Sequence, residues 1–331
     1  MMSKDQISLS RRRLLAGASV AAAASFVGGA SSVMAKAPMQ NMQAPAVYRF
    51  KVGAIEATVV SDGPLPMGEP KADVFVGLSK EDLTKALTDN FLPTDNVVLE
   101  QNVLVLNTGD KVVLFDTGMG TDKMLGPNTG RLPANLKAAG IDAKDVDAVV
   151  LTHAHPDHCF GLTTEGGGPT FPNAQIYMAQ SDFDFWTDEA KLGNEMLKGF
   201  VAGARARLLP NRDRVVFIKD GQEILPGVQA MAAPGHTVGH TVYMITSQGK
   251  TMCCGGDIAH HYVVVVENPR LEFAYDTDGK QAVASRLRVF DMLAAQRIPV
   301  LPYHFPWPGI GHLAKRGDGY RYFPAPMQTA L

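Results

Sequence analysis

Three histidines and one aspartate lie within six positions of the chain, in the stretch HAHPDH at 153–158. The stretch follows the apolar run DAVVL at 147–151, which is typical of a buried strand that leads into a loop. Imidazole nitrogens and carboxylate oxygens are the ligands that zinc, manganese, iron and cobalt take in proteins. The alternative is a turn with solvated histidines, but the whole chain has only nine histidines, so this concentration favours a metal site.

Four more metal-capable residues follow apolar, strand-like runs elsewhere in the chain: Asp116, His236, Asp257 and His304. Strands that end at one edge of a sheet bring such residues together, while the loops carry the site. His236 and His304 add imidazoles to HAHPDH, and Asp257 adds a carboxylate that can bridge two ions. Seven ligands are too many for one tetrahedral zinc and suit two ions that hold a hydroxide between them. The chemistry this predicts is hydrolysis.

Composition restricts the partners of this site. The chain has 331 residues, of which 46% are hydrophobic and 19% charged, as expected of a soluble globular protein with an ample core. The net charge is -2, and no basic run interleaves with aromatic residues, so we expect a small-molecule substrate and no nucleic acid. Three cysteines make no disulfide framework, and we expect them to act as small core residues.

The N-terminal segment has the features of an export signal. Arg11, Arg12 and Arg13 precede a weakly apolar stretch rich in alanine, glycine and serine, which predicts a twin-arginine-type signal over 1–37. A membrane anchor would need about 20 strongly apolar residues. We therefore expect a periplasmic or secreted protein with no stable membrane anchor after processing. Residues 38–47 read as a tether, and 48–331 as the hydrolase domain.

Hydrophobic spacing predicts the elements that must position the site. Strands are expected in a hairpin over 47–63, in a second pair over 102–118, and at 214–220, 228–234, 241–247, 251–257 and 298–304. Helices are expected at 80–90, 131–140 and 280–296. A polar and aromatic segment, 165–212, interrupts this pattern and contains the cluster FDFW at 183–186.

These motifs together resemble the metallo-β-lactamase superfamily. The resemblance rests on HxHxDH at 153–158, GHTVGH at 235–240, GGD at 255–257 and the later His304. Longer stretches, which include LGPNTGRLPANLKAAG (125–140) and FPWPGIGH (305–312), resemble methyl parathion hydrolase and the related lactonases and aryl esterases. The resemblance implies an α/β fold, an αββα four-layer sandwich, with the metal site at one edge of its two sheets.

The resemblance also implies a role for each ligand. One divalent ion would be held by three histidines, His153, His155 and His236. The other would be held by Asp157, His158 and His304, while Asp257 and a hydroxide bridge the two. Zinc is the expected metal, with manganese, iron or cobalt as alternatives. Asp157 and Asp257 are the residues assigned to catalysis, and Asp116 and His240 would support the ligands from behind. Members of the family are often dimers, so a homodimer is compatible with the resemblance.

The substrate pocket is expected where the family has an aromatic wall. The candidate lining residues are Leu65, Phe183, Phe185, Trp186, Phe200 and His260, although a Trp-Phe cluster is more often core than pocket. After Asp257 the chain reads IAHH, where phosphotriesterase-like members have aliphatic residues. Whether His260 enters the pocket or packs elsewhere is open at this point. The difference favours lactones or aryl and carboxyl esters over organophosphate triesters.

Three other functions share the motif. A β-lactam-hydrolysing enzyme fits the ligand set and the export signal, and a glyoxalase II-type thioesterase fits the ligand set, but the longer stretches resemble other relatives. A non-catalytic periplasmic metal-binding protein, from a different class, would bind metal without turnover.

Overall fold

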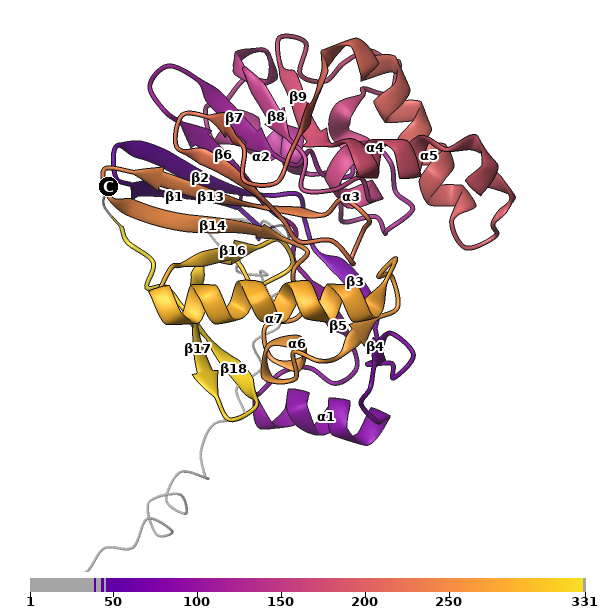
Figure 1. Ribbon diagram of the computed structural model, residues 1–331, viewed down its shortest axis with the longest axis vertical. Helices are drawn as coiled ribbons and strands as arrows, with labels where there is room; N and C mark the ends of the chain where they lie inside the picture. Colours follow the sequence, from indigo (N-terminus) through magenta and orange to yellow (C-terminus); the bar gives the residue numbers. More distant parts are fainter. Residues whose placement is uncertain (1–38, 40–42, 45, 330–331) are drawn as a thin grey trace, which may run out of the picture. The chain divides into compact units, whose positions relative to one another are not determined.

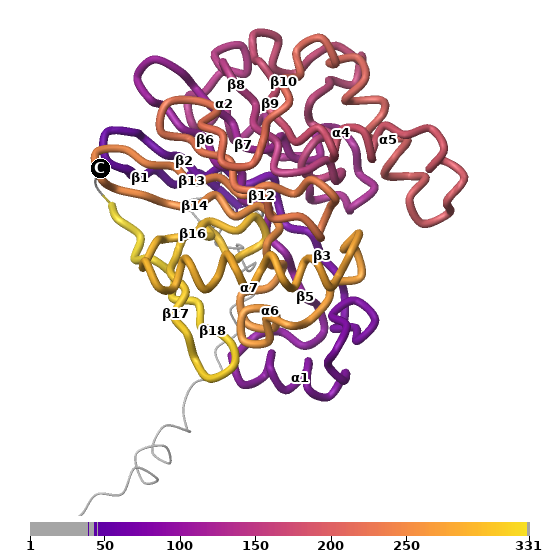
Figure 2. Tube along the Cα trace, in the orientation of Figure 1, coloured from indigo at the N-terminus to yellow at the C-terminus, as the bar shows by residue number. Residues whose placement is uncertain are grey.

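Two seven-stranded sheets form the centre of the protein (Figure 1), which a computed structural model describes at residues 39, 43, 44 and 46–329. The first sheet has the order β1 (Val47–Val52), β2 (Ile55–Ser61), β6 (Asn102–Asn107), β7 (Val112–Phe115), β8 (Ala148–Val150), β9 (Gln175–Ala179) and β10 (Val215–Ile218). The second has the order β11 (Glu223–Leu225), β12 (Val228–Ala232), β13 (Thr241–Ser247), β14 (Lys250–Gly256), β16 (Val300–Pro302), β17 (Gly311–Arg316) and β18 (Gly319–Pro324). Figure 2 shows β1 beside β13 and β14. Strands from early and late parts of the chain therefore lie side by side where the two sheets pack together.

Helices and two short strand pairs complete this part of the chain, which belongs to one unit, Ala44–Leu331. The helices are α1 (Lys80–Asp89), α2 (Leu132–Ala138), α3 (Pro156–Cys159), α4 (Gln180–Thr187), α5 (Lys198–Leu208), α6 (Val264–Glu267) and α7 (Gly279–Gln296). The short pairs are β3 (Leu65–Gly68) with β5 (Val97–Leu99), and β4 (Phe75–Val76) with β15 (Glu272–Phe273). In Figure 1, α2, α4 and α5 lie over the first sheet and α7 runs along the second.

Three apolar layers hold these elements together, because successive side chains of a strand point to opposite faces. On β6, Val103 and Val105 pack against the helices over the first sheet, while Leu104 and Leu106 pack between the two sheets. The second sheet repeats the pattern: Cys254 faces the first sheet, whereas Cys253 packs in the layer that contains residues of α7. Three apolar layers between four layers of secondary structure confirm the expected αββα sandwich. The three cysteines are free and buried, as expected.

The strands of both sheets deliver the chemistry-bearing residues. Asp116 follows β7, His153 comes shortly after β8, and His236 follows β12. Asp257 follows β14 directly, and His304 lies two positions after β16. The side chains of the last four gather in one buried cluster, so the residues at these strand ends do converge.

Segment 165–212 is more regular than the sequence suggested. It contains β9, α4 and α5, which the interrupted apolar pattern concealed. In α5 the pattern is weakened by Gly203, where a Cβ would lie 2.0 Å from the ring of Phe160. The helix therefore needs a glycine at a position where sequence spacing would favour an apolar side chain.

The predicted signal, 1–37, lies outside the described residues, as does half of the predicted tether, 38–47. In the described part of the chain, no helix combines the length and the apolar character that crossing a membrane requires.

Candidate metal centre

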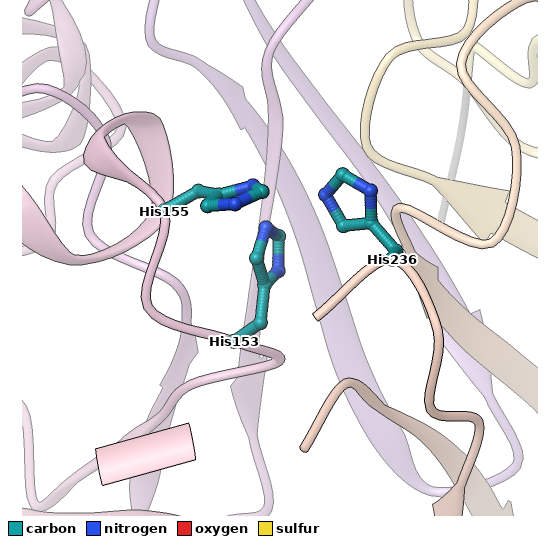
Figure 3. Close-up of side chains that lie close together, drawn as sticks. All are labelled: His153, His155 and His236. Carbon is teal, nitrogen blue, oxygen red and sulfur yellow. The ribbon is translucent and has the colours of Figure 1, made fainter. Parts of the chain in front are cut away.

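The seven predicted ligands lie together and are all buried, with exposed fractions between 0 and 6%. Their donor atoms form groups within which every pair lies less than 4.8 Å apart. One group is His153, His155 and His236, and another is Asp157, His158 and His304. Figure 3 shows the rings of the first group turned toward one another, although His236 comes from a separate part of the chain. The structure thus brings these residues together in the two sets that the family resemblance implied. Asp257 also groups with His153 and His158, and with His236 and His260.

Asp257 lies between the two groups. Its Oδ2 is 3.3 Å from Nε2 of His236 and 3.1 Å from Nε2 of His304, and its Oδ1 is 3.3 Å from Nε2 of His158. One carboxylate therefore reaches a member of each group, which is the placement that a bridging ligand needs.

Several donor atoms of this cluster have no hydrogen-bond partner among the described residues. They are Nε2 of His153, His158 and His236, and Oδ1 of Asp257. Unpaired polar atoms are costly to bury, and native proteins pair nearly all of them. Imidazole nitrogens and a carboxylate oxygen that share a buried space are the donors that divalent transition metals prefer. The residues present therefore fit two divalent cations.

Asp116 and His240 support the ligands from behind, as the sequence suggested. Asp116 lies 2.9 Å from Nδ1 of His158 and accepts two bonds from Thr152, one from its amide and one from its hydroxyl, each 2.8 Å long. Its φ of 62° is a conformation that non-glycine residues rarely adopt, and such strain often accompanies functional sites. His240 accepts the N–H of Asp257 at Nε2, 2.9 Å away, and its Nδ1 lies 3.1 Å from the carbonyl of Ala233.

Two further supports were missed by sequence reasoning. Nδ1 of His304 lies 2.8 Å from the carbonyl of Glu100, and Nδ1 of His236 lies 2.9 Å from Oδ1 of Asp276. A partner that takes the Nδ1 proton leaves Nε2 of each ring free to bind a metal. The sequence could not reveal either partner. Any residue can supply a backbone carbonyl, and Asp276 lies 40 positions after His236, outside any local motif.

Asp182 of α4 ties the two ligand loops together and was also missed. Its carboxylate accepts the amide of Ala154, between His153 and His155, at 2.7 Å, and the amide of Gly239 at 2.9 Å. A Cβ at Gly239 would lie 2.8 Å from the backbone nitrogen of Asp182, so the close approach requires glycine. The sequence offered little signal, because the same helix carries a second acid, Asp184, that is exposed.

Burial and neighbouring charges set the protonation of the cluster. Burial lowers the pKa of His153 and of His155 well below the usual histidine range, which keeps both rings neutral and able to bind metal. Burial alone would raise the pKa of Asp257, but His304 and His158 hold it well below its usual range. Burial would also lower the pKa of His158, His236 and His304, but Asp257 and its neighbouring carboxylates raise it, to about 9 for His236. The cluster therefore combines two neutral imidazoles with three that hold protons, which a bound metal would displace, around an ionised carboxylate.

A cavity opens onto this cluster. Its apolar walls are formed by Leu65, Met67, Leu99, Leu125, Phe200, Phe273 and Tyr275. Its polar floor is formed by His155, Asp157, His236, Asp257, His260 and His304. None of the described residues that line it is a lysine or an arginine. Among the described residues, the cavity thus combines a metal-capable floor with apolar walls and without lysine or arginine.

The predicted pocket residues divide into two sets. Leu65, Phe200 and His260 line the cavity, but Phe183, Phe185 and Trp186 do not. Helix α4 turns Phe183 and Trp186 into the core, where Trp186 packs edge-on behind His155 with 4.9 Å between ring centroids. Phe185 packs against Trp186 rather than against the cavity. The core interpretation of this cluster is therefore the correct one. Met67, Leu99, Leu125, Phe273 and Tyr275 were missed, because the cavity draws them from four separate segments.

His260 faces the cavity rather than a strand. Its ring stacks on Phe273 with 3.8 Å between centroids and 15° between planes. Its Nε2 lies 3.3 Å from Oδ2 of Asp257, and neither ring nitrogen has a hydrogen-bond partner among the described residues. The next residue, His261, instead packs edge-on against Phe75.

Known proteins share both the sequence pattern and the fold. The family model of the Metallo-beta-lactamase superfamily matches residues 97–295. An N-acyl homoserine lactonase of Bacillus cereus is 26% identical over 161 residues, 44% of this chain and 57% of that protein. The chain thus spans little more than half the length of this curated relative. A solved dizinc quorum-quenching lactonase, AidC, in complex with a product, N-hexanoyl-L-homoserine, is 28% identical. Its TM-score is 0.81, and the match covers 86% of this chain and 99% of that one.

A second solved structure, the hydrolase AbOPH, is also 28% identical, with a TM-score of 0.80 over 87% of this chain and 100% of that chain. The family model spans more than half of the chain, and the ligand residues of that family's motifs converge in one buried cluster. The chain therefore belongs to the metallo-beta-lactamase superfamily.

Proposed function

We propose that this protein is a lactonase that also hydrolyses aryl and carboxyl esters, with two zinc ions as its cofactors. The observation that carries the proposal is the cavity, whose apolar walls lead to a metal-capable floor and whose described lining residues include no lysine or arginine. Such a cavity favours a neutral substrate with an apolar acyl chain or ring. The similarity to an N-acyl homoserine lactonase and to AidC supports the same substrate class.

The residues of the chain would divide the work between floor and walls. His153, His155 and His236 would hold one ion, Asp157, His158 and His304 the other, and Asp257 would bridge them. Bound together, two such ions lower the pKa of a water and polarise a carbonyl oxygen. Leu65, Phe200 and Phe273 would exclude solvent and hold the apolar part of the substrate. The nitrogens of His260, which have no partner among the described residues, would offer the substrate a polar contact beside the metal ligands.

The same cavity argues against two alternatives. A β-lactam carries a carboxylate beside its ring, and no lysine or arginine among the described residues lines this cavity to pair with it. A bulky phosphotriester would meet the imidazole of His260 in place of an aliphatic side chain. We therefore rank β-lactams last and organophosphate triesters below lactones.

A hydrolysis panel on the metal-loaded protein tests the proposal. The panel contains dihydrocoumarin, acyl-homoserine lactones, p-nitrophenyl acetate, methyl parathion and nitrocefin. We expect the lactones to give the highest kcat/KM, the aryl ester a lower one, and methyl parathion a lower one still. Nitrocefin as the only good substrate would replace the proposal with a β-lactamase. Metal binding without turnover of any compound would favour a metal-binding protein.

Export is a separate part of the proposal, supported by Arg11–Arg13 and the weakly apolar stretch after them. Fractionation of cells that express the full chain should place the protein in the periplasm or medium. The same chain with Arg11, Arg12 and Arg13 replaced by lysine should stay inside the cell. Export of both chains alike would contradict twin-arginine transport.

A further inference from the structure

The segment 272–278, between α6 and α7, contacts both the substrate cavity and a metal-ligand loop. Phe273 and Tyr275 line the cavity. Three bonds tie the next residues to the loop of His236: the amide and the hydroxyl of Thr277 donate to the carbonyl of His236 at 2.9 and 3.0 Å, and the amide of Asp278 donates to the carbonyl of Gly235 at 2.8 Å. The cavity wall and the ligand loop are therefore joined directly.

Asp276 lies at the centre of this junction, and its side chain is only 1% exposed. Its Oδ1 is 2.9 Å from Nδ1 of His236, and its Oδ2 accepts the amide of Phe273 at 3.0 Å. The first contact fixes the ring of His236 with Nε2 directed at Asp257, 3.3 Å away. The second fixes the backbone from which the ring of Phe273 projects. Each oxygen of one carboxylate therefore has a different task.

The bond from the Phe273 amide to Asp276 affects the substrate cavity through the stacked ring of Phe273. The ring of Phe273 lies 3.8 Å from that of His260, nearly parallel, and both rings line the cavity. A shift of the Phe273 backbone would move this wall. Such a shift would change the space that holds the apolar part of a substrate. It would have less effect on the position of the reacting carbonyl, which would lie at the floor of the cavity.

We propose that Asp276 is a positioning residue that couples the orientation of the metal ligand His236 to the substrate wall at Phe273. The substrate half of this inference rests on the proposed lactonase function, whereas the metal half does not. Asparagine at this position has only one acceptor oxygen, so it can serve either the His236 ring or the Phe273 amide, but not both. If its amide nitrogen faces His236, the ring must accept at Nδ1 and carry its proton on Nε2, which removes a metal donor.

The experiment compares Asp276→Asn with Asp278→Asn. The control makes the same chemical change two positions away, at an exposed residue whose side chain accepts the amide of Gln281, a bond that the oxygen of asparagine can keep. For each protein, zinc affinity is measured by competition with a chromophoric chelator, and KM and kcat are measured at saturating zinc on short-chain and long-chain acyl-homoserine lactones. Thermal unfolding is recorded in parallel.

We expect Asp276→Asn to weaken zinc binding by about 10- to 100-fold, the usual effect of losing the partner of a metal-bound histidine. We also expect the ratio of KM values for long-chain and short-chain lactones to change by several-fold, and Asp278→Asn to change neither. A lower unfolding temperature with unchanged zinc affinity and an unchanged KM ratio would reduce Asp276 to a structural residue and overturn the proposal.

A second variant covers the case in which Asp276→Asn does not fold. Asp276→Glu keeps both acceptor oxygens but moves them by one methylene, so zinc affinity and the KM ratio should again change together, by smaller factors. No change of either quantity in that folded variant would also overturn the proposal. If the wild-type protein hydrolyses no lactone at all, the proposed function fails, while the zinc affinities still decide the role of Asp276.

Discussion

At the scale of single residues, buried carboxylates position much of this site. Asp116, Asp182 and Asp276 each hold a ligand or a ligand loop, and Asp62 holds a loop beside the cavity. The residues of the metal-capable cluster could be predicted from the sequence, because histidines and acids cluster after apolar runs. The carboxylates behind them could not all be predicted: an acid in a loop looks solvated until tertiary packing buries it, as Asp276 shows.

Asp62 gives a prediction for the dependence of stability on pH. It accepts the amides of Met119, Gly130 and Leu132 at 2.8–3.1 Å, and this segment carries Leu125 to the cavity wall. Burial raises the pKa of Asp62 from 3.8 to about 6. The folded state therefore holds the proton more tightly than the unfolded state, so this group's stabilisation is complete below pH 3.8 and is lost as pH rises through 6.

The loss amounts to roughly 3 kcal/mol, at about 1.4 kcal/mol per pKa unit. The free energy of unfolding of the wild type, relative to Asp62→Asn, should therefore fall between pH 4 and pH 6, as measured by chemical denaturation. Asp110→Asn, which changes an exposed turn residue, should leave the pH profile as it is in the wild type. A wild-type advantage that stays constant or grows over this range would contradict the shift.

At the scale of elements, the strands could be predicted better than the parts between them. The hairpin over 47–63 and the helix over 280–296 appear as β1–β2 and α7, because their periodicity is set by one buried face. The α4 helix was harder to interpret, because its aromatic residues suit a pocket as well as a core. Whether these aromatic side chains enter the core or the pocket depends on how α4 packs against the first sheet and the ligand loops. The spacing of residues in the sequence does not determine that packing.

Asp182 provides the test of how α4 acts on the site. In Asp182→Asn, one of the amides of Ala154 and Gly239 loses its acceptor, at a cost of about 1–3 kcal/mol in unfolding free energy. Zinc affinity should fall as well, because the two ligand loops are no longer tied together. Unlike Asp276→Asn, this variant should leave the KM ratio for long and short lactones unchanged, because Asp182 does not contact the cavity wall.

The matched control is Asp184→Asn, on the exposed face of the same helix. It should match the wild type in denaturant unfolding and in zinc competition. Equal losses in the two variants would mean that α4 responds to any loss of charge, and would remove the specific role of Asp182.

At the scale of the whole molecule, four layers of secondary structure support one site whose ligands come from both sheets. His153 follows β8 of the first sheet, and Asp257 follows β14 of the second. Metal bound between them would connect the two sheets. Because it binds the folded state and not the unfolded state, it would raise the free energy of unfolding by about 4 kcal/mol when free metal is 1,000 times the dissociation constant. Chelation should therefore lower the unfolding temperature.

The effect of chelation should depend on the ligand set. His304→Ala should show a smaller decrease of unfolding temperature on chelation than the wild type, because it binds less metal. His312→Ala, which changes an exposed histidine on β17, should show the full decrease. A decrease of equal size in both variants would mean that the chelator acts elsewhere.

The most direct test of the central claim is a zinc titration of the metal-free protein, with dihydrocoumarin hydrolysis recorded at each addition. Two ions held by seven ligands predict almost no activity without zinc, a rise with each addition, and a plateau at two zinc ions per chain. Full hydrolysis by the metal-free protein, or a plateau at one zinc ion per chain, would contradict the account.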